Sequence, residues 1–236
     1  MQVDQAIFTS VASGRVQGYQ LAARSDGIDD RLSQTLTRWG PSHAALCSSD
    51  PSAESFNFHA VDDGLFALSR TIYGGPEYSR RGGLQLMTRY ALLQRPQLQE
   101  FRSDPLTLMR LARTEGRLAL VTRFEKRLPP LTLPGATAAV FWAAPAREEQ
   151  PGLANDVAAR LANGERLAVT HCGNPFALLQ QVFRLLPEAQ RLDVSFTTGL
   201  KPTAHRPFQL HFLPGDSPET RRSAVALGLT CLSASA

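Results

Sequence analysis

The sequence predicts an α+β fold, in which a strand-rich N-terminal domain is followed by a smaller α/β domain with a short mixed sheet. In the first half, apolar residues alternate with polar ones and glycine-rich turns separate the segments, which is typical of antiparallel strands. In the second half, amphipathic helical segments alternate with short apolar strands, which favours parallel strands joined by helices. The proline-rich stretch 128–131 (LPPL) lies between the two patterns. We therefore expect one domain over residues 1–130 and another over residues 131–236.

The chain opens with a predicted hairpin and a helix. Residues 5–10 (QAIFTS) and 19–23 (YQLAA) predict two strands, joined by a wide loop over residues 11–17. Asp29 or Asp30 then caps a helix, because a side-chain oxygen at this position accepts a hydrogen bond from an N–H group of the first turn. The apolar residues of the helix recur at helical spacing and predict its buried face: Leu32, Leu36 and Trp39.

The next predicted strands surround a long loop. Residues 55–61 and 65–73 predict a tight hairpin, and residues 84–93 predict the following strand. The glycine pairs Gly74-Gly75 and Gly82-Gly83 bracket a polar insert between the last two strands. Because glycine adopts positive φ at little cost, the pairs predict a long hairpin loop with sharply bent ends.

The tip of this loop gathers hydrogen-bonding side chains. The candidate interaction residues are Glu77, Tyr78, Arg80 and Arg81, together with Arg89 on the following strand. Tyrosine and arginine are enriched at the hot spots of protein interfaces, so we predict a protein-binding loop. Tyrosines and arginines within residues 73–90 would also suit single-stranded nucleic acid, but the charge is local and Glu77 lies among the arginines, so a nucleic-acid partner is not expected. A solvated hairpin tip is the simpler alternative.

Beyond the loop, Ser103 or Asp104 caps a helix that begins at Pro105, and residues 117–124 predict another strand. Residues 137–143 are apolar throughout and fit a buried strand or a buried helix equally well.

The last hundred or so residues read as alternating helices and strands. The predicted helices cover residues 151–163 and 175–186, the second capped by Asn174, and Ser217 caps a short final helix. The predicted strands cover the remaining apolar segments: residues 166–171, 191–197 and 207–213.

Composition narrows the class of protein. The formal net charge is +4 and no block of like charge indicates a nucleic-acid tail. No apolar run is long enough to span a membrane, and the N-terminus has no secretory signal, so we expect a cytoplasmic protein. The three cysteines are scattered, which predicts no disulfide framework. The five histidines show no metal-ligand spacing, and no nucleotide-binding fingerprint is present, so we expect neither a metal nor a cofactor.

Cys172 is a weak candidate for a catalytic nucleophile. It lies between a predicted strand and the helix capped by Asn174, and a helix N-terminus lowers the pKa of a thiol and supplies N–H groups for an oxyanion. His171, His205 or His211 would have to serve as the base. However, the surrounding sequence THCGN does not match a nucleophile elbow, and a structural cysteine is the more common case. A cysteine-dependent hydrolase is therefore an alternative rather than the expected function.

Three stretches resemble a known family. Residues 6–28 (AIFTSVASGRVQGYQLAARSDGI) and residues 74–89 (GGPEYSRRGGLQLMTR) are similar to the type 2 N-terminal domain of the bacterial GTPase-associated proteins. Residues 183–198 (FRLLPEAQRLDVSFTT) resemble the middle domain of the same family. Arg89 follows Thr88 where the family pattern has histidine, so no catalytic role is carried over to this position.

The resemblance implies a non-catalytic adaptor that works with a small GTPase, or with another protein partner, in a bacterial conflict or defence system. It implies no catalytic residues.

Overall fold

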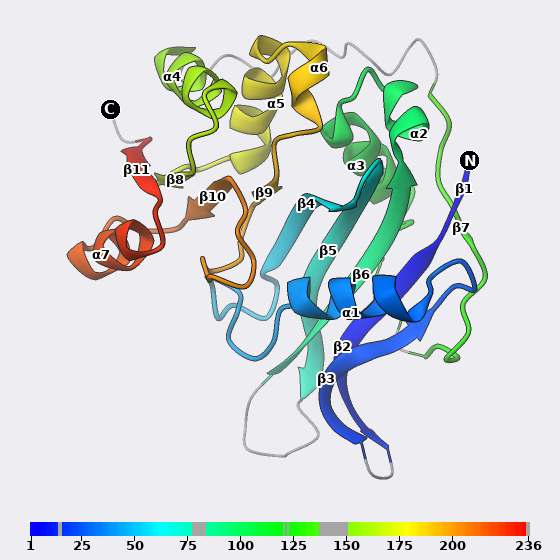
Figure 1. Cartoon of the computed structure of the whole chain (residues 1–236). Coiled ribbons are helices and arrows are strands. Elements are labelled where there is room, and N and C mark those ends of the chain that lie inside the picture. The colour runs from blue at the N-terminus through cyan, green and yellow to red at the C-terminus, as the bar shows by residue number, and fades with distance from the viewer. Residues whose placement is uncertain (14–15, 77–83, 120, 122, 137–150, 235–236) are drawn as a thin grey trace.

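One mixed sheet runs through both halves of the chain (Figure 1). The computed structural model describes residues 1–13, 16–76, 84–119, 121, 123–136 and 151–234. The nine strands of the sheet lie in the order β11-β8-β10-β9-β4-β5-β6-β2-β3. The predicted α+β class is confirmed, because strand-rich structure in the first half is followed by alternating helices and strands in the second.

The five strands of the first half are antiparallel neighbours. They are β2 (Gln5–Ser13), β3 (Val16–Arg24), β4 (Glu54–Asp62), β5 (Leu65–Pro76) and β6 (Leu84–Gln94). A separate two-stranded pair joins β1 (Gln2–Val3) to β7 (Leu131–Thr132). The antiparallel hairpins follow from the turn residues between them, such as Gly64 with φ of 68°.

The four strands of the second half are parallel to one another. They are β8 (Leu167–Thr170), β9 (Phe196–Thr197), β10 (Leu210–Leu213) and β11 (Thr230–Ser233). Strand β9 pairs antiparallel with β4 through Asn57 and Phe58, so the parallel strands extend the antiparallel sheet.

Helices cover both faces of the sheet. The largest apolar core lies between one face and α2 (Arg95–Gln99), α3 (Pro105–Thr114), α4 (Pro151–Ala162) and α5 (Pro175–Leu185). On the other face, α1 (Asp30–Trp39) packs against β2, β5 and β6, and α7 (Pro218–Ala226) packs against β8 and β10. A short helix, α6 (Glu188–Arg191), leads into β9. Figure 1 shows α1 lying across the strands of the first half.

A stripe of buried polar side chains crosses the sheet on the face where α1 also lies. Asn57 on β4 accepts hydrogen bonds from Ser55 and Thr197 and donates to Ser69 and Thr71. Since each of these side chains is buried, their mutual hydrogen bonds offset the loss of water.

The predicted caps Asn174 and Ser217 are confirmed, and of the alternatives left open, Asp29 rather than Asp30 and Asp104 rather than Ser103 cap their helices. Asp29, Asp104, Asn174 and Ser217 each accept a hydrogen bond from a backbone N–H of the helix that they precede. These contacts span two or three residues, so the local sequence decides them.

Several predicted boundaries were wrong. The wide loop expected over residues 11–17 is mostly strand, because β2 and β3 remain paired as far as Ser13 and Val16. The described residues of 117–124 form turns and bends instead of a strand. Arg70 and Arg89 donate side-chain hydrogen bonds to the carbonyl groups of Leu118 and Ala119, which holds this segment without a strand partner.

Two predictions for the second half also need correction or fall outside the described residues. The strand expected over residues 191–197 is reduced to Phe196–Thr197, because the preceding residues form α6 and a turn. Strand β11 was not predicted. Residues 137–143, for which a strand or a helix was expected, lie outside the described residues.

Candidate functional site

The β5–β6 hairpin carries the loop predicted to bind a protein. Its strands pair from Leu65 and Gln94 at the base to Pro76 and Leu84 at the far end, with an irregularity beyond Tyr73. This is the longest ladder among the described pairs. The predicted interaction residues Glu77, Tyr78, Arg80 and Arg81 lie outside the described residues.

Side-chain contacts hold the far end of the hairpin in place. The Tyr73 hydroxyl donates a hydrogen bond of 2.9 Å to the carbonyl oxygen of Ser48, which ties β5 to the segment between α1 and β4. Gly75 has a φ of 106°, a conformation that favours glycine, and an irregularity in the ladder accompanies it. The strands next to the tip are therefore held in place by contacts with the rest of the protein.

Arg89, the fifth predicted interaction residue, makes contacts within the protein. Its Nε and Nη2 atoms donate to Gln5 Oε1 at 3.0 and 2.8 Å, and its Nη1 atom donates to the carbonyl oxygen of Ala119. Gln5 in turn donates to the carbonyl oxygen of Pro129. Partial burial lowers the pKa of the Arg89 guanidinium. Arg89 thus joins β6, β2 and the segment that follows α3.

A pair of arginines bound to Glu54 was not predicted from the sequence. The Glu54 carboxylate forms ion pairs with Arg70 at 2.7 Å and with Arg113 at 2.9 Å, each through a different oxygen. Both guanidinium groups also lie over the ring of Phe56, at 5.7 and 5.4 Å from its centroid. Only the register of β4 with β5 and the position of α3 bring these residues together, so spacing along the chain could not reveal them.

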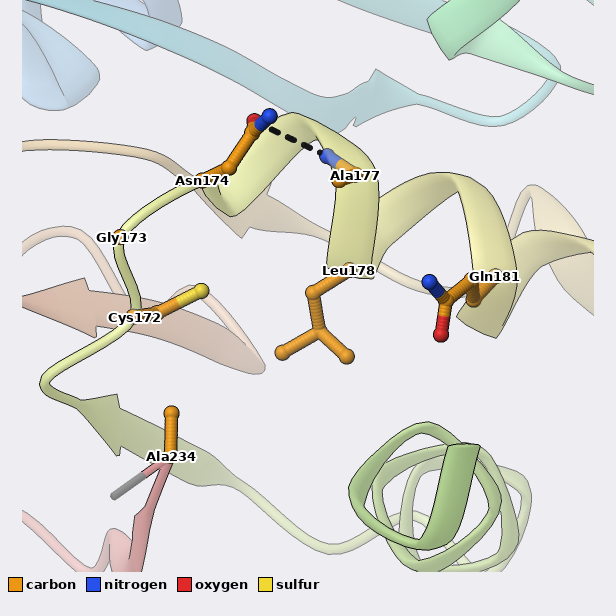
Figure 2. Close-up of a pocket in the computed structure, with 7 residues that line it drawn as sticks. All are labelled: Cys172, Gly173, Asn174, Ala177, Leu178, Gln181 and Ala234. Atoms are coloured by element: carbon orange, nitrogen blue, oxygen red, sulfur yellow. Dashed lines mark hydrogen bonds between the residues drawn. The ribbon is translucent and has the colours of Figure 1, made fainter. Parts of the chain in front are cut away.

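Cys172 lines a small cavity at the start of α5 (Figure 2). The cavity has a volume of about 40 Å³, with Leu178, Gln181 and Ala234 among its lining residues. Space of this size accommodates one or a few water molecules rather than an organic substrate. The thiol is half-buried and packs against the main core.

The start of α5 offers few N–H groups for an oxyanion. Pro175 at the first helical position has no N–H group, and the Ala177 N–H donates to the side chain of Asn174 at 3.1 Å (Figure 2). Since an oxyanion hole requires N–H groups that point at the reacting oxygen, this helix terminus is poorly suited to the chemistry.

The three candidate bases lie in different environments. His171 follows β8 with a φ of 57° and is exposed, and His205 is exposed as well. His211 is buried on β10, where its Nδ1 atom lies 3.4 Å from the carbonyl oxygen of Leu200. Within the described part of the chain, no histidine lines the Cys172 cavity.

Within residues 1–13, 16–76, 84–119, 121, 123–136 and 151–234, no group of three or more histidine, cysteine, aspartate or glutamate side chains is placed to hold a metal ion. Among the same residues, no helix combines the length and apolar character that crossing a membrane requires.

Comparison with known protein families places more than half of the chain in a family. A family model described as GTPase-associated protein 1, N-terminal domain type 2, matches residues 2–134. This range contains α1 to α3 and β1 to β7, including the whole β5–β6 hairpin. No curated protein and no solved structure matches the chain.

Proposed function

This chain belongs to the family of GTPase-associated proteins with the type 2 N-terminal domain, and on that basis we propose that it is a non-catalytic adaptor that binds a small GTPase. The family match over residues 2–134 is the observation that carries the proposal. We further propose that the adaptor acts in the cytoplasm, as part of a bacterial conflict or defence system.

The tip of the β5–β6 hairpin is the proposed contact surface. A binding loop works best when a rigid scaffold positions it, because fewer conformations are then lost on association. The long ladder below the tip and the Tyr73 contact with Ser48 supply such a scaffold. Tyr78 has few rotatable bonds and can anchor in a pocket at a low entropic cost.

Charge complementarity supports an acidic partner surface. Arg80 and Arg81 are adjacent in the sequence, and each guanidinium group can pair with a carboxylate in bidentate geometry. Such pairing speeds association and weakens as the salt concentration rises. Arg89 is expected to support the loop from below, in keeping with its contacts to Gln5 and Ala119.

Binding measurements with small GTPases from the same organism test this function. The chain is immobilised, and each GTPase is supplied in its GDP form and bound to a non-hydrolysable GTP analogue. Tyr78→Ala and Arg81→Ala should each weaken binding by about 1–3 kcal/mol, the range typical of interface hot spots, while the melting temperature stays unchanged.

Arg222→Ala is the matched control, because Arg222 is an exposed arginine on α7, outside the matched residues. It should leave both affinity and melting temperature unchanged. If the hairpin variants bind normally but melt earlier, the tip packs on its own domain and the proposed contact surface is wrong. If single-stranded nucleic acid binds and the same variants abolish that binding, the nucleic-acid alternative replaces this one.

A further inference from the structure

Buried polar side chains that lack a hydrogen-bond partner gather in one part of the fold. Within the described residues, such unpartnered atoms belong to Ser10, His59, Thr203, Arg206 and His211. All but Ser10 lie around Phe208. The His59 and His211 rings flank the Phe208 ring at centroid distances of 5.7 and 5.8 Å, and Thr203 and Arg206 precede it in a short turn. Since native proteins pair most buried polar groups, this concentration indicates a segment whose closed position is unfavourable for its polar atoms.

Arg206 carries the least favourable of these buried groups. The residue is 7 % exposed, and its side chain has neither an ion-pair partner nor a hydrogen-bond partner among the residues that the structure describes. The titratable groups that interact with it are the Tyr90 hydroxyl and the His211 ring, and neither is negatively charged at neutral pH. Burial lowers the pKa of the guanidinium, which still stays charged at neutral pH. A buried charge without a partner of opposite sign destabilises the state that buries it.

The segment that carries this arginine, residues 202–207, is attached to the rest of the protein at its two ends. Before it, backbone hydrogen bonds of 2.8 Å join residues 199–201 to residues 45–47. After it, the N–H of Gln209 donates to a backbone carbonyl just before β9. Between these points, the described hydrogen bonds of the segment run only within the turn that leads to Phe208. Figure 1 shows this connection between β9 and β10 reaching toward α1.

We propose that residues 202–207 form a flap that opens while the sheet stays folded, and that opening moves Arg206 from the interior to solvent. Opening hydrates the guanidinium and the Thr203 hydroxyl, and it breaks no described hydrogen bond to a residue beyond Phe208. Pro202 and Pro207 fix the backbone φ angle near both ends, so the flap moves as a short, stiff turn. In the open form Arg206 is free to pair with an anionic group, so the flap controls whether this arginine takes part in binding.

Thiol labelling of an engineered cysteine measures the opening. The Thr203 hydroxyl is closed to solvent, so the thiol in Thr203→Cys reacts only when the flap opens. Ala204→Cys, at an exposed position in the same segment, gives the rate for an accessible thiol. Mass spectrometry of peptides distinguishes each engineered thiol from the three native cysteines. The Thr203→Cys thiol should react measurably in the native protein but at least ten-fold more slowly than the Ala204→Cys thiol. Equal rates would show that the segment is not closed, and the proposal would be wrong.

Urea distinguishes flap opening from unfolding of the whole protein. A local opening exposes little new surface, so the labelling rate of Thr203→Cys should stay constant in urea below the unfolding transition. Val169→Cys, at a fully buried position on β8, should label faster as urea is added, because its exposure requires the sheet to unfold. If the Thr203→Cys and Val169→Cys rates rise in parallel, there is no independent flap and the proposal fails.

The variant Arg206→Met tests the role of the buried charge, because methionine is a long apolar side chain without one. It should slow the labelling of Thr203→Cys at least ten-fold and leave the melting temperature unchanged or higher. Arg222→Met, at an exposed position on α7, removes the same charge elsewhere and should change neither quantity. Equal or faster labelling in Arg206→Met would overturn the proposal. These measurements need no GTPase, so their outcome is independent of the contact surface proposed at the β5–β6 tip.

Discussion

Thr197 donates a hydrogen bond of 2.6 Å to the side-chain oxygen of Asn57, across 140 residues of sequence. The bond joins β9 to β4, and therefore the second half of the chain to the residues that the family model matches. Both side chains are buried, so water cannot replace the bond if either partner is removed.

Asn57→Ala should lower the free energy of unfolding by about 3 kcal/mol, because it leaves Ser55, Thr197 and Ser69 without a shared partner. Urea unfolding at neutral pH measures the change. Asn163→Ala, at an exposed position after α4, should stay within about 0.5 kcal/mol of the unaltered protein. Equal stability of the two variants would mean that the buried stripe contributes little.

The free energy of unfolding should begin to fall on acidification at pH values well above the pKa of most carboxyl groups. Burial lowers the pKa of His59 to about 3 and that of His211 to about 4, both below the value of about 6.5 in the unfolded chain. At pH values between the folded and the unfolded pKa, the unfolded state binds more protons than the folded state. The stabilisation by the two neutral histidines is therefore present above the unfolded pKa of about 6.5 and is lost progressively as the pH falls below it.

Between pH 7 and pH 5, proton binding to these two histidines in the unfolded chain should lower the free energy of unfolding by about 4 kcal/mol. Melting temperatures across this range test the prediction, and His59→Phe should remove about half of the loss. A pH-independent melting temperature between 7 and 5 would show that neither histidine stays buried and neutral.

The thiols should react slowly in the native state. Burial raises the pKa of Cys47 to about 11, which leaves few thiolate groups at pH 7.5, and Cys172 packs against the core beside its small cavity. Labelling of single-cysteine variants with a thiol reagent, with and without denaturant, measures this protection. Fast stoichiometric labelling of native Cys172, with a lowered pKa, would favour the hydrolase alternative.

The division of the chain at residue 130 stays a prediction, and limited proteolysis tests it. The backbone of Arg24 pairs with that of Lys126 and Leu128, which protects this segment, so we expect trypsin to cut first after Arg147. The two fragments should elute together under native conditions, because β4 pairs with β9 and the largest core contains residues from both. Separate elution of two folded fragments would show that the halves are independent domains.

The sequence by itself determined the features that depend on neighbours along the chain. The caps at Asn174 and Ser217 were predicted outright, those at Asp29 and Asp104 each as one of two neighbouring residues. The tight turn at Asp62–Gly64 was also predicted. Each of these features rests on contacts between residues a few positions apart. The alternation of apolar residues in β4 and β5 likewise predicted two strands.

Tertiary structure alone decided how these elements combine. The pairing of β4 with β9, the hydrogen bonds from Arg89 to Gln5, and the ion pair of Arg113 with Glu54 all join residues far apart in sequence. A local pattern shows which face of a strand is buried, but not which strand lies beside it. The reason is that the choice of neighbour depends on burial and hydrogen bonding summed over the whole sheet.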